Sequence, residues 1–378
     1  MSVIELAQAL IRCPSVTPDD AGCQAILADR LRALGFDIQR LMFGQTSNLW
    51  ARKGKEGPLL ILAGHTDVVP PGELTRWHFP PFEAVIKNQT LYGRGAQDMK
   101  SSLAAMVIAV ERYLKEHSHF SGSIAFLITS DEEGDGLDGT PKVVEYLHTQ
   151  NVHMDYVVVG EATCQKQLGD TIKVGRRGSL HAQITFKGTG GHVAYPTHAI
   201  NPIHAALSGL QALCQTEWDQ GNEYFPPTTF QISNIHAGTG APNVIPTELK
   251  VTANFRFSPE SSVEKIKNNV MALLDHAGCE YTIEWQVGAE AYYSPPGKLA
   301  LSVQKALQEC CHLTPHFNTE GGTSDGRWLS HYCSEVIEFG PVNDTIHKPN
   351  ENIPLRDLEK LVECYEVILK EVLGKNKK

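Results

Sequence analysis

The first half of the chain alternates between helical and strand-like hydrophobic patterns. Apolar residues recur at helical spacing in segments 4–10 and 23–34. Segments 59–63, 123–130 and 156–159 are instead almost continuously apolar, which is typical of buried parallel strands. Strands that are separated by helices predict an α/β domain with a doubly wound sheet.

From about residue 178 the pattern changes to alternation. In segments 181–186 and 249–255, apolar and polar residues follow one another in turn, which is typical of a sheet with one face in water. Two helical stretches complete a small α+β unit, and the earlier pattern returns after it. We therefore predict an α/β domain made of residues 1–177 and 292–378, interrupted by an inserted α+β domain of residues 178–291.

Composition limits the location and the partners. The chain has 378 residues, which is enough for two domains. No apolar run approaches the roughly 20 residues of a membrane span, and the N-terminus lacks a signal-peptide pattern, so we expect a cytoplasmic protein. Nine cysteines without a C-x-x-C pair are expected to be reduced thiols. A net charge of −10 argues against nucleic-acid or membrane partners.

Five segments place a histidine or a carboxylate just after an apolar strand or at the start of a helix, where ligands bind in open α/β sheets. Their candidate residues are His65 and Asp67, Asp98, the run Asp131-Glu132-Glu133, Glu161, and His347. Three of them have an ordinary alternative, since His65 suits a surface histidine, Asp98 a helix N-cap and the acidic run a solvated loop. Asp67 is placed either to hold the second nitrogen of His65 or to orient a neighbouring catalytic group.

Taken together, the candidates point to metal chemistry. Carboxylates that crowd at the end of a buried strand repel each other and favour a cation. A set of His, Asp and Glu without Cys suits zinc, cobalt or manganese. The combination predicts a two-metal site with a shared carboxylate that activates a water molecule.

The same segments resemble those of the dimetal (M20-type) peptidase and deacylase superfamily, which includes carboxypeptidase G2, acetylornithine deacetylase and aminoacylase. The shared segments are GHTDVVPPGE, LYGRGAQDMKSSLAAM, TSDEEGDG, VVVGEAT, GTGGHVAYP and NDTIHKPNE. Two more, KVGRRGSL and FNTEGGTSDGR, are similar to the desuccinylase branch. The resemblance covers nearly the whole chain. It implies a zinc-exopeptidase-like catalytic domain, an inserted dimerisation or lid domain, and hydrolysis of N-succinyl-LL-2,6-diaminopimelate in lysine biosynthesis.

The resemblance also implies a role for each candidate in the metal site. One zinc ion is held by His65 and Glu161, and a second by Glu133 and His347. Asp98 bridges the two ions, and the peptide bond after it is cis. Two zinc ions per subunit are implied, with cobalt as an expected substitute.

Further roles follow from the same resemblance. Glu132 is the general base and acid, and Asp67 supports His65. His192 lies in the inserted domain and reaches the active site of the partner subunit in a homodimer, where it stabilises the oxyanion. The small anionic substrate is contacted by Arg176, Ser179, Tyr195, Asn243, Arg256, Gly322, Thr323 and Asn343, with Arg177 and Arg327 as further candidates; Arg176 and Arg177 are alternatively a solvated hinge pair.

The chain departs from the family pattern at Gln97 and Ser101, where the family usually has a small residue and a glycine. Neither is expected to be a ligand, although Gln97 would add a polar contact near the metals. Three other functions stay open. Residues 322–326 fit the G-x-S-x-G motif of serine hydrolases, the substrate could be that of an acetylornithine deacetylase, aminoacylase or dipeptidase, and the chain could be a metal-dependent binding protein.

Overall fold

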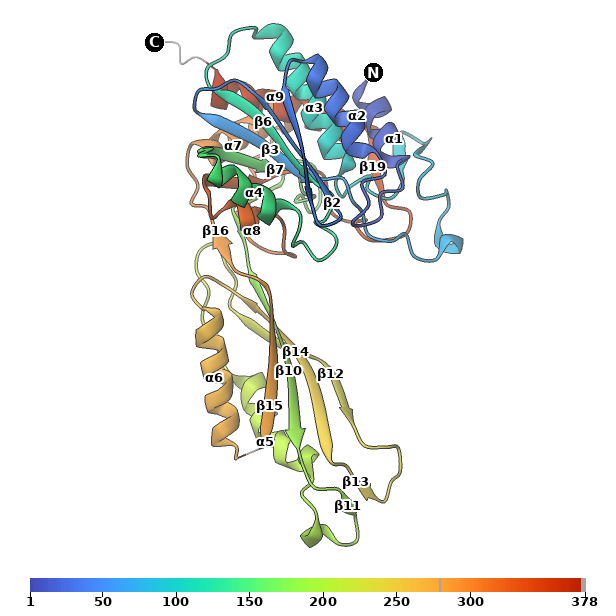
Figure 1. Ribbon diagram of the computed structural model, residues 1–378, viewed down its shortest axis with the longest axis vertical. Coiled ribbons are helices and arrows are strands. Elements are labelled where there is room, and N and C mark those ends of the chain that lie inside the picture. Colours follow the sequence, from blue (N-terminus) through green and yellow to red (C-terminus); the bar gives the residue numbers. More distant parts are fainter. Residues whose placement is uncertain (279, 375–378) are drawn as a thin grey trace. The chain divides into compact units, whose positions relative to one another are not determined.

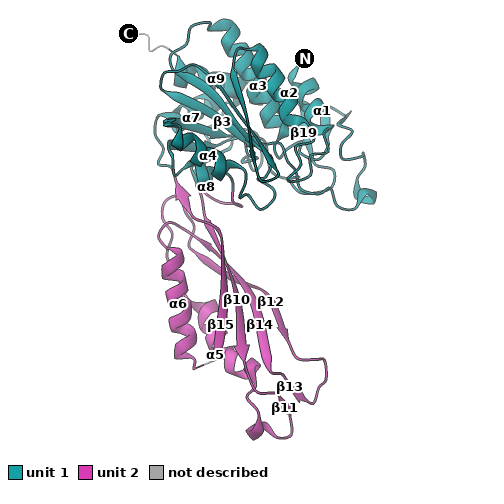
Figure 2. Ribbon diagram, viewed as in Figure 1, with its two compact units in different colours: residues 1–175, 294–318, 324–378 teal, residues 176–293, 319–323 magenta. Residues whose placement is uncertain are grey.

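The computed structural model describes residues 1–278 and 280–374, which form two compact units (Figures 1 and 2). Unit 2 comprises Arg176–Tyr293 and Thr319–Thr323, and unit 1 comprises the rest of the described chain. The expected division at 177 and 292 lies two residues from these junctions. The grouping of Thr319–Thr323 with unit 2 has no counterpart in the sequence pattern.

Unit 1 is built on an eight-stranded mixed sheet (Figure 1). Its strand order is β1 (Asp37–Phe43), β2 (Thr46–Lys53), β6 (Ser123–Thr129), β3 (Leu59–His65), β7 (Met154–Val159), β18 (Cys333–Glu338), β8 (Thr171–Lys173) and β17 (His316–Asn318). The central strands β6, β3, β7 and β18 are parallel. Every residue of β3 and β6 is buried, which explains their continuous apolar sequences.

Helices cover both faces of this sheet. They are α1 (Val3–Ile11), α2 (Cys23–Ala33), α3 (Lys100–Glu116), α4 (Thr140–Thr149), α7 (Lys298–Cys311), α8 (Gly326–Leu329) and α9 (Leu355–Leu373). The connection from β3 through α3 leads to β6, and the next connection, through α4, leads back past β3 to β7. Because such crossovers are right-handed, α3 and α4 lie on opposite faces. Helix α9 packs on α1, α3 and α7, whereas α4 packs on α8.

This topology defines where a ligand can bind. The sheet strand that follows β3 along this connection, β6, lies on one side of the β3–β7 pair, and the sheet strand that follows β7, β8, lies on the other side. The carboxyl ends of two such strands border a crevice in open α/β sheets. His65 is the last residue of β3, and Glu161 follows the end of β7.

Short elements complete unit 1. A three-stranded antiparallel sheet has the order β19 (Asn352–Pro354), β5 (Thr90–Tyr92) and β4 (Val85–Lys87), and η1 spans Leu74–Arg76. Since β5 precedes the Asp98 segment and β19 follows the His347 segment, their pairing brings the two predicted ligand segments toward each other.

Unit 2 is a four-stranded antiparallel sheet packed on two helices. The strand order is β12 (Thr229–Ala237), β14 (Glu248–Phe257), β10 (Gly178–Lys187) and β15 (Tyr281–Ala289), and the helices are α5 (Pro202–Gln215) and α6 (Val263–His276). Alternate residues of β14 are buried and share one core with α5 and α6, as the period of two predicts. The smaller elements are β9 (Gly175–Arg176), β11 (Gly191–His192), η2 (Pro196–His198), β13 (Val244–Ile245) and β16 (Tyr292–Tyr293).

Two expectations from composition can be compared with the structure. None of the described helices is long and apolar enough to cross a membrane. The eight described cysteines are free thiols, and Cys279 lies outside the described residues.

Candidate metal centre

Five predicted ligands lie together at one edge of the unit 1 sheet, on five separate segments. His65 ends β3, Glu133 follows β6, and Glu161 follows β7. Asp98 lies just before α3, and His347 lies in the turns between β18 and β19. Parallel strands present their carboxyl ends at the same edge, so segments far apart in sequence meet there.

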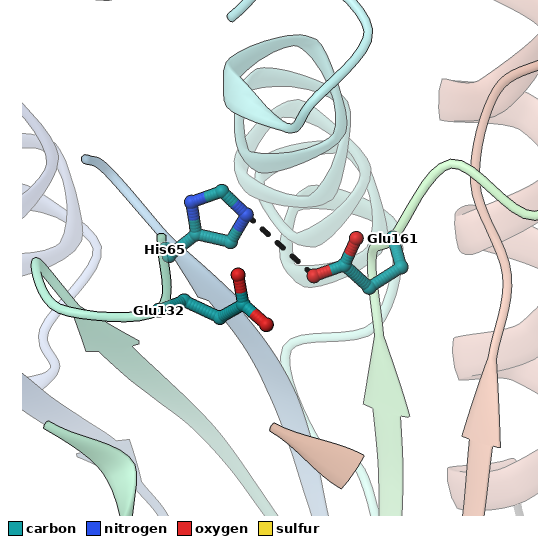
Figure 3. Close-up of side chains that lie close together, drawn as sticks. All are labelled: His65, Glu132 and Glu161. Atoms are coloured by element: carbon teal, nitrogen blue, oxygen red, sulfur yellow. Dashed lines mark ion pairs between the residues drawn. The ribbon is translucent and has the colours of Figure 1, made fainter. Parts of the chain in front are cut away.

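The Asp98 carboxylate lies between the two histidines. Its Oδ1 is 3.1 Å from Nε2 of His65, and its Oδ2 is 3.4 Å from Nε2 of His347. On the outer sides, Glu161 Oε1 is 3.5 Å from the same His65 nitrogen, and Glu133 Oε1 is 3.0 Å from the same His347 nitrogen. Figure 3 shows His65 and Glu161 facing each other, with Glu132 beside them. Each histidine thus shares Asp98 and has a glutamate of its own.

These residues fit a pair of metal ions. Among the described residues, the ligand atoms of His65, Glu132 and Glu161 lie within 4.8 Å of one another, as do those of His65, Asp98 and Glu133. Glu161 Oε1 is buried without a hydrogen-bond partner in the described chain, and such an oxygen is costly unless a cation satisfies it. Oxygen and imidazole ligands without sulfur suit zinc, cobalt or manganese.

The ordinary alternatives for single motifs are not supported. His65 is 1% exposed and so is not a surface histidine. The N-cap position of α3 is Met99 rather than Asp98, and the Asp98–Met99 peptide is cis, as expected. The acidic run is not a solvated loop either, since Asp131 is buried and its carboxylate accepts hydrogen bonds from the backbone of Leu137 and Asp138.

Burial and crowding perturb the carboxylates. Burial, and then the nearby charge of Asp98, raise the pKa of Glu161 to about 7. Burial, and then the charge of Glu161, raise the pKa of Glu132 well above its usual range. A carboxyl group with a raised pKa is suited to exchange protons near neutral pH.

The same negative charges also raise the pKa values of the histidines, where the protonated form that they favour is the charged one. Hydrogen bonds to Asp98 and then to Glu133 raise the pKa of His347 to about 10. Burial lowers the pKa of His65, but the adjacent carboxylates of Asp98 and Glu161 outweigh burial and raise it well above the usual value. Metal ligation requires neutral imidazoles, so metal ions at this site would compete with protons for His65 and His347.

The Asp67 carboxylate contacts the segment that carries Glu132 and Glu133 more directly than it contacts His65. Nδ1 of His65 is 2.8 Å from the backbone oxygen of Asp67 and 3.6 Å from its carboxylate. The Asp67 carboxylate instead accepts hydrogen bonds from the backbone nitrogens of Glu132, at 3.3 Å, and Glu133, at 3.0 Å. It is fully buried, and it orients the segment that carries both glutamates.

Glu351 is a structural part of the site to which the sequence analysis assigns no role. Its fully buried carboxylate accepts hydrogen bonds from the backbone nitrogens of Gly95, Gln97 and Asp98 and from the Arg94 side chain. These four bonds fix the loop that ends in Asp98. The only signal in the sequence is that Glu351 belongs to the NDTIHKPNE segment.

The remaining candidates lie in three places. Asn343 is in unit 1, where its backbone nitrogen donates to the carbonyl of Cys164 at 3.0 Å. In unit 2, Arg176 donates to the carbonyl of Gly322, with Thr323 next in sequence, and Ser179 is opposite Arg256 in the β10–β14 register.

The third place is the β11–β13 region of unit 2. His192 and Asn243 line one pocket there, and Tyr195 is exposed, with its ring centroid 5.9 Å from that of His192. The structure therefore gathers the predicted metal ligands within unit 1, and it places all the predicted substrate contacts except Asn343 and Arg327 in unit 2.

The serine-hydrolase alternative fails at Ser324. Its hydroxyl is fully buried and donates to the buried carboxylate of Glu338. A nucleophilic serine needs an exposed hydroxyl beside a histidine base. The G-x-S-x-G match is therefore a coincidence of sequence.

Comparison with known sequences gives a consistent picture. The profile of "Peptidase family M20/M25/M40" matches residues 61–371. The chain is 51% identical over 362 residues to the succinyl-diaminopimelate desuccinylase of Coxiella burnetii, covering 96% of this chain and 97% of that protein. It is 52% identical over 371 residues to the enzyme of the same name from Alkalilimnicola ehrlichii, covering 98% and 99%.

Solved structures with low sequence identity share the fold. An M20 family metallo-carboxypeptidase from Sulfolobus solfataricus superposes with a TM-score of 0.80 at 17% identity, covering 98% of this chain and 99% of that one. A dinuclear metal-binding peptidase of the M20 family from Bacillus subtilis superposes with a TM-score of 0.73 at 16% identity, covering 98% of each.

Proposed function

Because the chain belongs to peptidase family M20/M25/M40, we propose that it hydrolyses N-succinyl-LL-2,6-diaminopimelate to succinate and LL-2,6-diaminopimelate. This reaction is a step in lysine and diaminopimelate biosynthesis. Two relatives that carry the desuccinylase name match nearly the whole chain at 51–52% identity, and all the segments expected to carry the chemistry lie within residues 61–371, which the family profile matches.

The Asp98 geometry is the observation that carries the proposal. A carboxylate with each oxygen directed at a different histidine, each paired with its own glutamate, is an arrangement for two ions that share one ligand. We assign His65 and Glu161 to one zinc ion, Glu133 and His347 to the other, and Asp98 to both. When bound, the two ions would polarise the scissile carbonyl and lower the pKa of a water molecule.

Glu132 then moves the proton. Its carboxyl group lies beside His65 and Glu161, and Asp67 holds its backbone. Glu132 accepts a proton from the attacking water and returns it to the amine nitrogen as the amide bond breaks. The tetrahedral oxyanion needs a hydrogen-bond donor, and we assign this role to His192 of the partner subunit.

The substrate carries several carboxylates, and unit 2 offers arginines to meet them. Burial, and then the positive charge of Arg177, lower the pKa of Arg256. Two guanidinium groups that repel each other are stabilised by an anionic ligand, and their planar forks suit carboxylates. Ser179 and Arg176 lie in the same unit, at the start of β10 and just before it.

We infer that the protein is a homodimer formed through unit 2. Helix α5 and the segment before it expose Ile200, Ile203 and Leu207, of which Leu207 is 59% exposed. Strand β12 lies at the sheet edge and exposes Ile235. An apolar stripe next to an unpaired strand edge favours a second copy of the same chain. A cytoplasmic location remains a prediction.

The test is a desuccinylation assay on purified protein before and after chelation, with metal content measured in parallel. We expect two ions per chain, loss of succinate release on chelation, and recovery with Zn²⁺ or Co²⁺. N-Acetylornithine, assayed side by side, is expected to be a poor substrate. A chain that hydrolyses acetylornithine faster would belong to a different branch, and full activity without metal would reject the mechanism.

A further inference from the structure

The side chain of Gln97 joins two segments that carry predicted metal ligands. Gln97 directly precedes Asp98 and is 2% exposed. Its Nε2 donates to Asp344 Oδ1 at 2.7 Å, and its Oε1 accepts from the backbone nitrogen of Thr345 at 2.9 Å and from the Thr345 hydroxyl at 2.7 Å. Asp344 and Thr345 belong to the segment that carries His347, so these hydrogen bonds tie that segment to the Asp98 loop.

The backbone of Gln97 is fixed from the other side. Glu351 Oε1 accepts from the backbone nitrogens of Gln97, at 2.8 Å, and Asp98, at 3.1 Å. The side chain of Gln97 therefore projects from a fixed backbone, which orients its amide toward Asp344 and Thr345. A rigid loop makes a side chain an effective support for a neighbouring ligand.

His347 depends on such support. It lies in a turn rather than in a helix or strand, and it has a positive φ of 60°. Its side chain is 50% exposed, so core packing does not hold the ring. Arg94 provides a separate tie, donating to the carbonyl of Lys348 at 3.2 Å. Gln97 acts on the other side of His347, at Asp344 and Thr345.

We propose that Gln97 is a positioning residue that sets the distance between Asp98 and His347 and thereby the affinity of the second metal position. The inference rests on the two-metal site proposed above. It concerns only the ion assigned to Glu133 and His347, because the hydrogen bonds of Gln97 reach neither His65 nor Glu161.

The chemistry requires an amide at position 97. One end of the side chain donates to a carboxylate while the other accepts from a hydroxyl and a backbone N–H. Gln97→Glu would set a carboxylate against Asp344 and replace attraction by repulsion. Adding Asp344→Asn would restore a donor–acceptor pair with the roles reversed. Gln97→Met keeps the length of the side chain and removes all three hydrogen bonds.

The experiment is a calorimetric titration of the metal-free chain with Zn²⁺, in which the two ions are resolved as separate binding events. We expect Gln97→Met to lower the affinity for the second ion by about 10–100-fold and to leave the affinity for the first ion unchanged. Gln97→Glu should weaken the second ion at least as much, and the double variant should recover most of the loss. Because the recovery is measured between two variants that share the same substitution at position 97, it separates positioning from a general loss of stability.

Gln24→Met is a matched control. Gln24 is also a 2% exposed glutamine of unit 1, and its amide hydrogen-bonds to Ser47. This substitution should leave the affinity of the second ion as in the wild type. The inference would be overturned by any of three results. These are an unchanged affinity for the second ion in Gln97→Met, an equal loss of affinity for both ions, or no recovery of affinity in the double variant. A wild-type chain that binds fewer than two ions would overturn the proposed metal centre as well.

Discussion

Replacing Glu132 by glutamine distinguishes two roles that the geometry leaves close together. The carboxylate of Glu132 lies within 4.8 Å of the ligand atoms of His65 and Glu161, so it could act as a metal ligand or as a base. Glutamine has nearly the same shape, and the backbone hydrogen bond to Asp67 does not involve the side chain. The substitution therefore removes the proton-transfer ability of the residue without changing the path of the loop.

The expected magnitude follows from what the group does. A positioned general acid or base contributes about 10²–10⁴-fold to the rate. Because Glu132 acts both on the attacking water and on the leaving amine, we expect kcat for Glu132→Gln to fall by about 10³–10⁴-fold, which corresponds to about 4–5.5 kcal/mol of lost transition-state stabilisation. KM should change little, because substrate contacts are assigned to other residues.

The assay is succinate release under saturating substrate, with metal content measured on the same samples. Two ions per chain should remain in Glu132→Gln. The matched control is Glu133→Gln, which changes the adjacent residue and should lose the second ion, because Glu133 is assigned as its ligand. Turnover retained in Glu132→Gln would refute the base assignment, and loss of an ion from that variant would make Glu132 a ligand.

Three further predictions concern protons and the second unit. Since the pKa of His347 is raised to about 10, zinc binding near pH 7 should release at least one proton, and the affinity should increase as pH rises towards 10. Calorimetry in buffers of different ionisation enthalpy would measure the released protons. Binding without proton release would contradict the prediction. Burial raises the pKa of Asp219, but hydrogen bonds from Thr228, Gly221 and Ser261 outweigh burial and lower it. Asp219 therefore stabilises the fold at pH values above its unfolded-state pKa, and this stabilisation is lost as pH falls through its folded-state pKa. Asp219→Asn should cost about 1–3 kcal/mol of unfolding free energy at pH 7 and progressively less as pH falls below the unfolded pKa, as measured by chemical denaturation along a pH series. A cost that does not change with pH would be the contrary result. Leu207→Glu should convert the dimer to a monomer in sedimentation velocity. Ser208→Glu, which is also exposed on α5 but lies about 100° around the helix from Leu207, should not; a dimer that survives Leu207→Glu would exclude this surface.

The central strands of unit 1 could be predicted because their environment leaves a direct mark on the sequence. A strand buried on both faces must be apolar throughout, so β3 and β6 were visible as uninterrupted runs. The edge pair β1 and β2 carries no such run and was not predicted. Strand β1 has no fully buried residue, and its position depends on pairing with β2.

The ligands were predictable for a different reason. His65 and Glu161 immediately follow predictable strands, and topology brings such positions together. The supports around them depend on contacts between distant segments, which no local pattern encodes. Gln97 meets Asp344 across 247 residues, and Glu351 meets Asp98 across 253. Position alone left two roles for Asp67, holding His65 or orienting a neighbouring group, and only the folded structure shows its carboxylate accepting from the backbone of Glu132 and Glu133.

The position of β18 in the sheet has a consequence for biosynthesis of the protein. This strand comes from residues 333–338 but lies between β7 and β8. A nascent chain that has emerged from the ribosome only as far as unit 2 therefore holds β7 with one edge open, and a bare edge of this kind invites pairing with other chains. Unit 2 lies entirely upstream of β18 and can complete its own sheet during translation, so the half-built sheet of unit 1 is the stage at which a chaperone would be most useful.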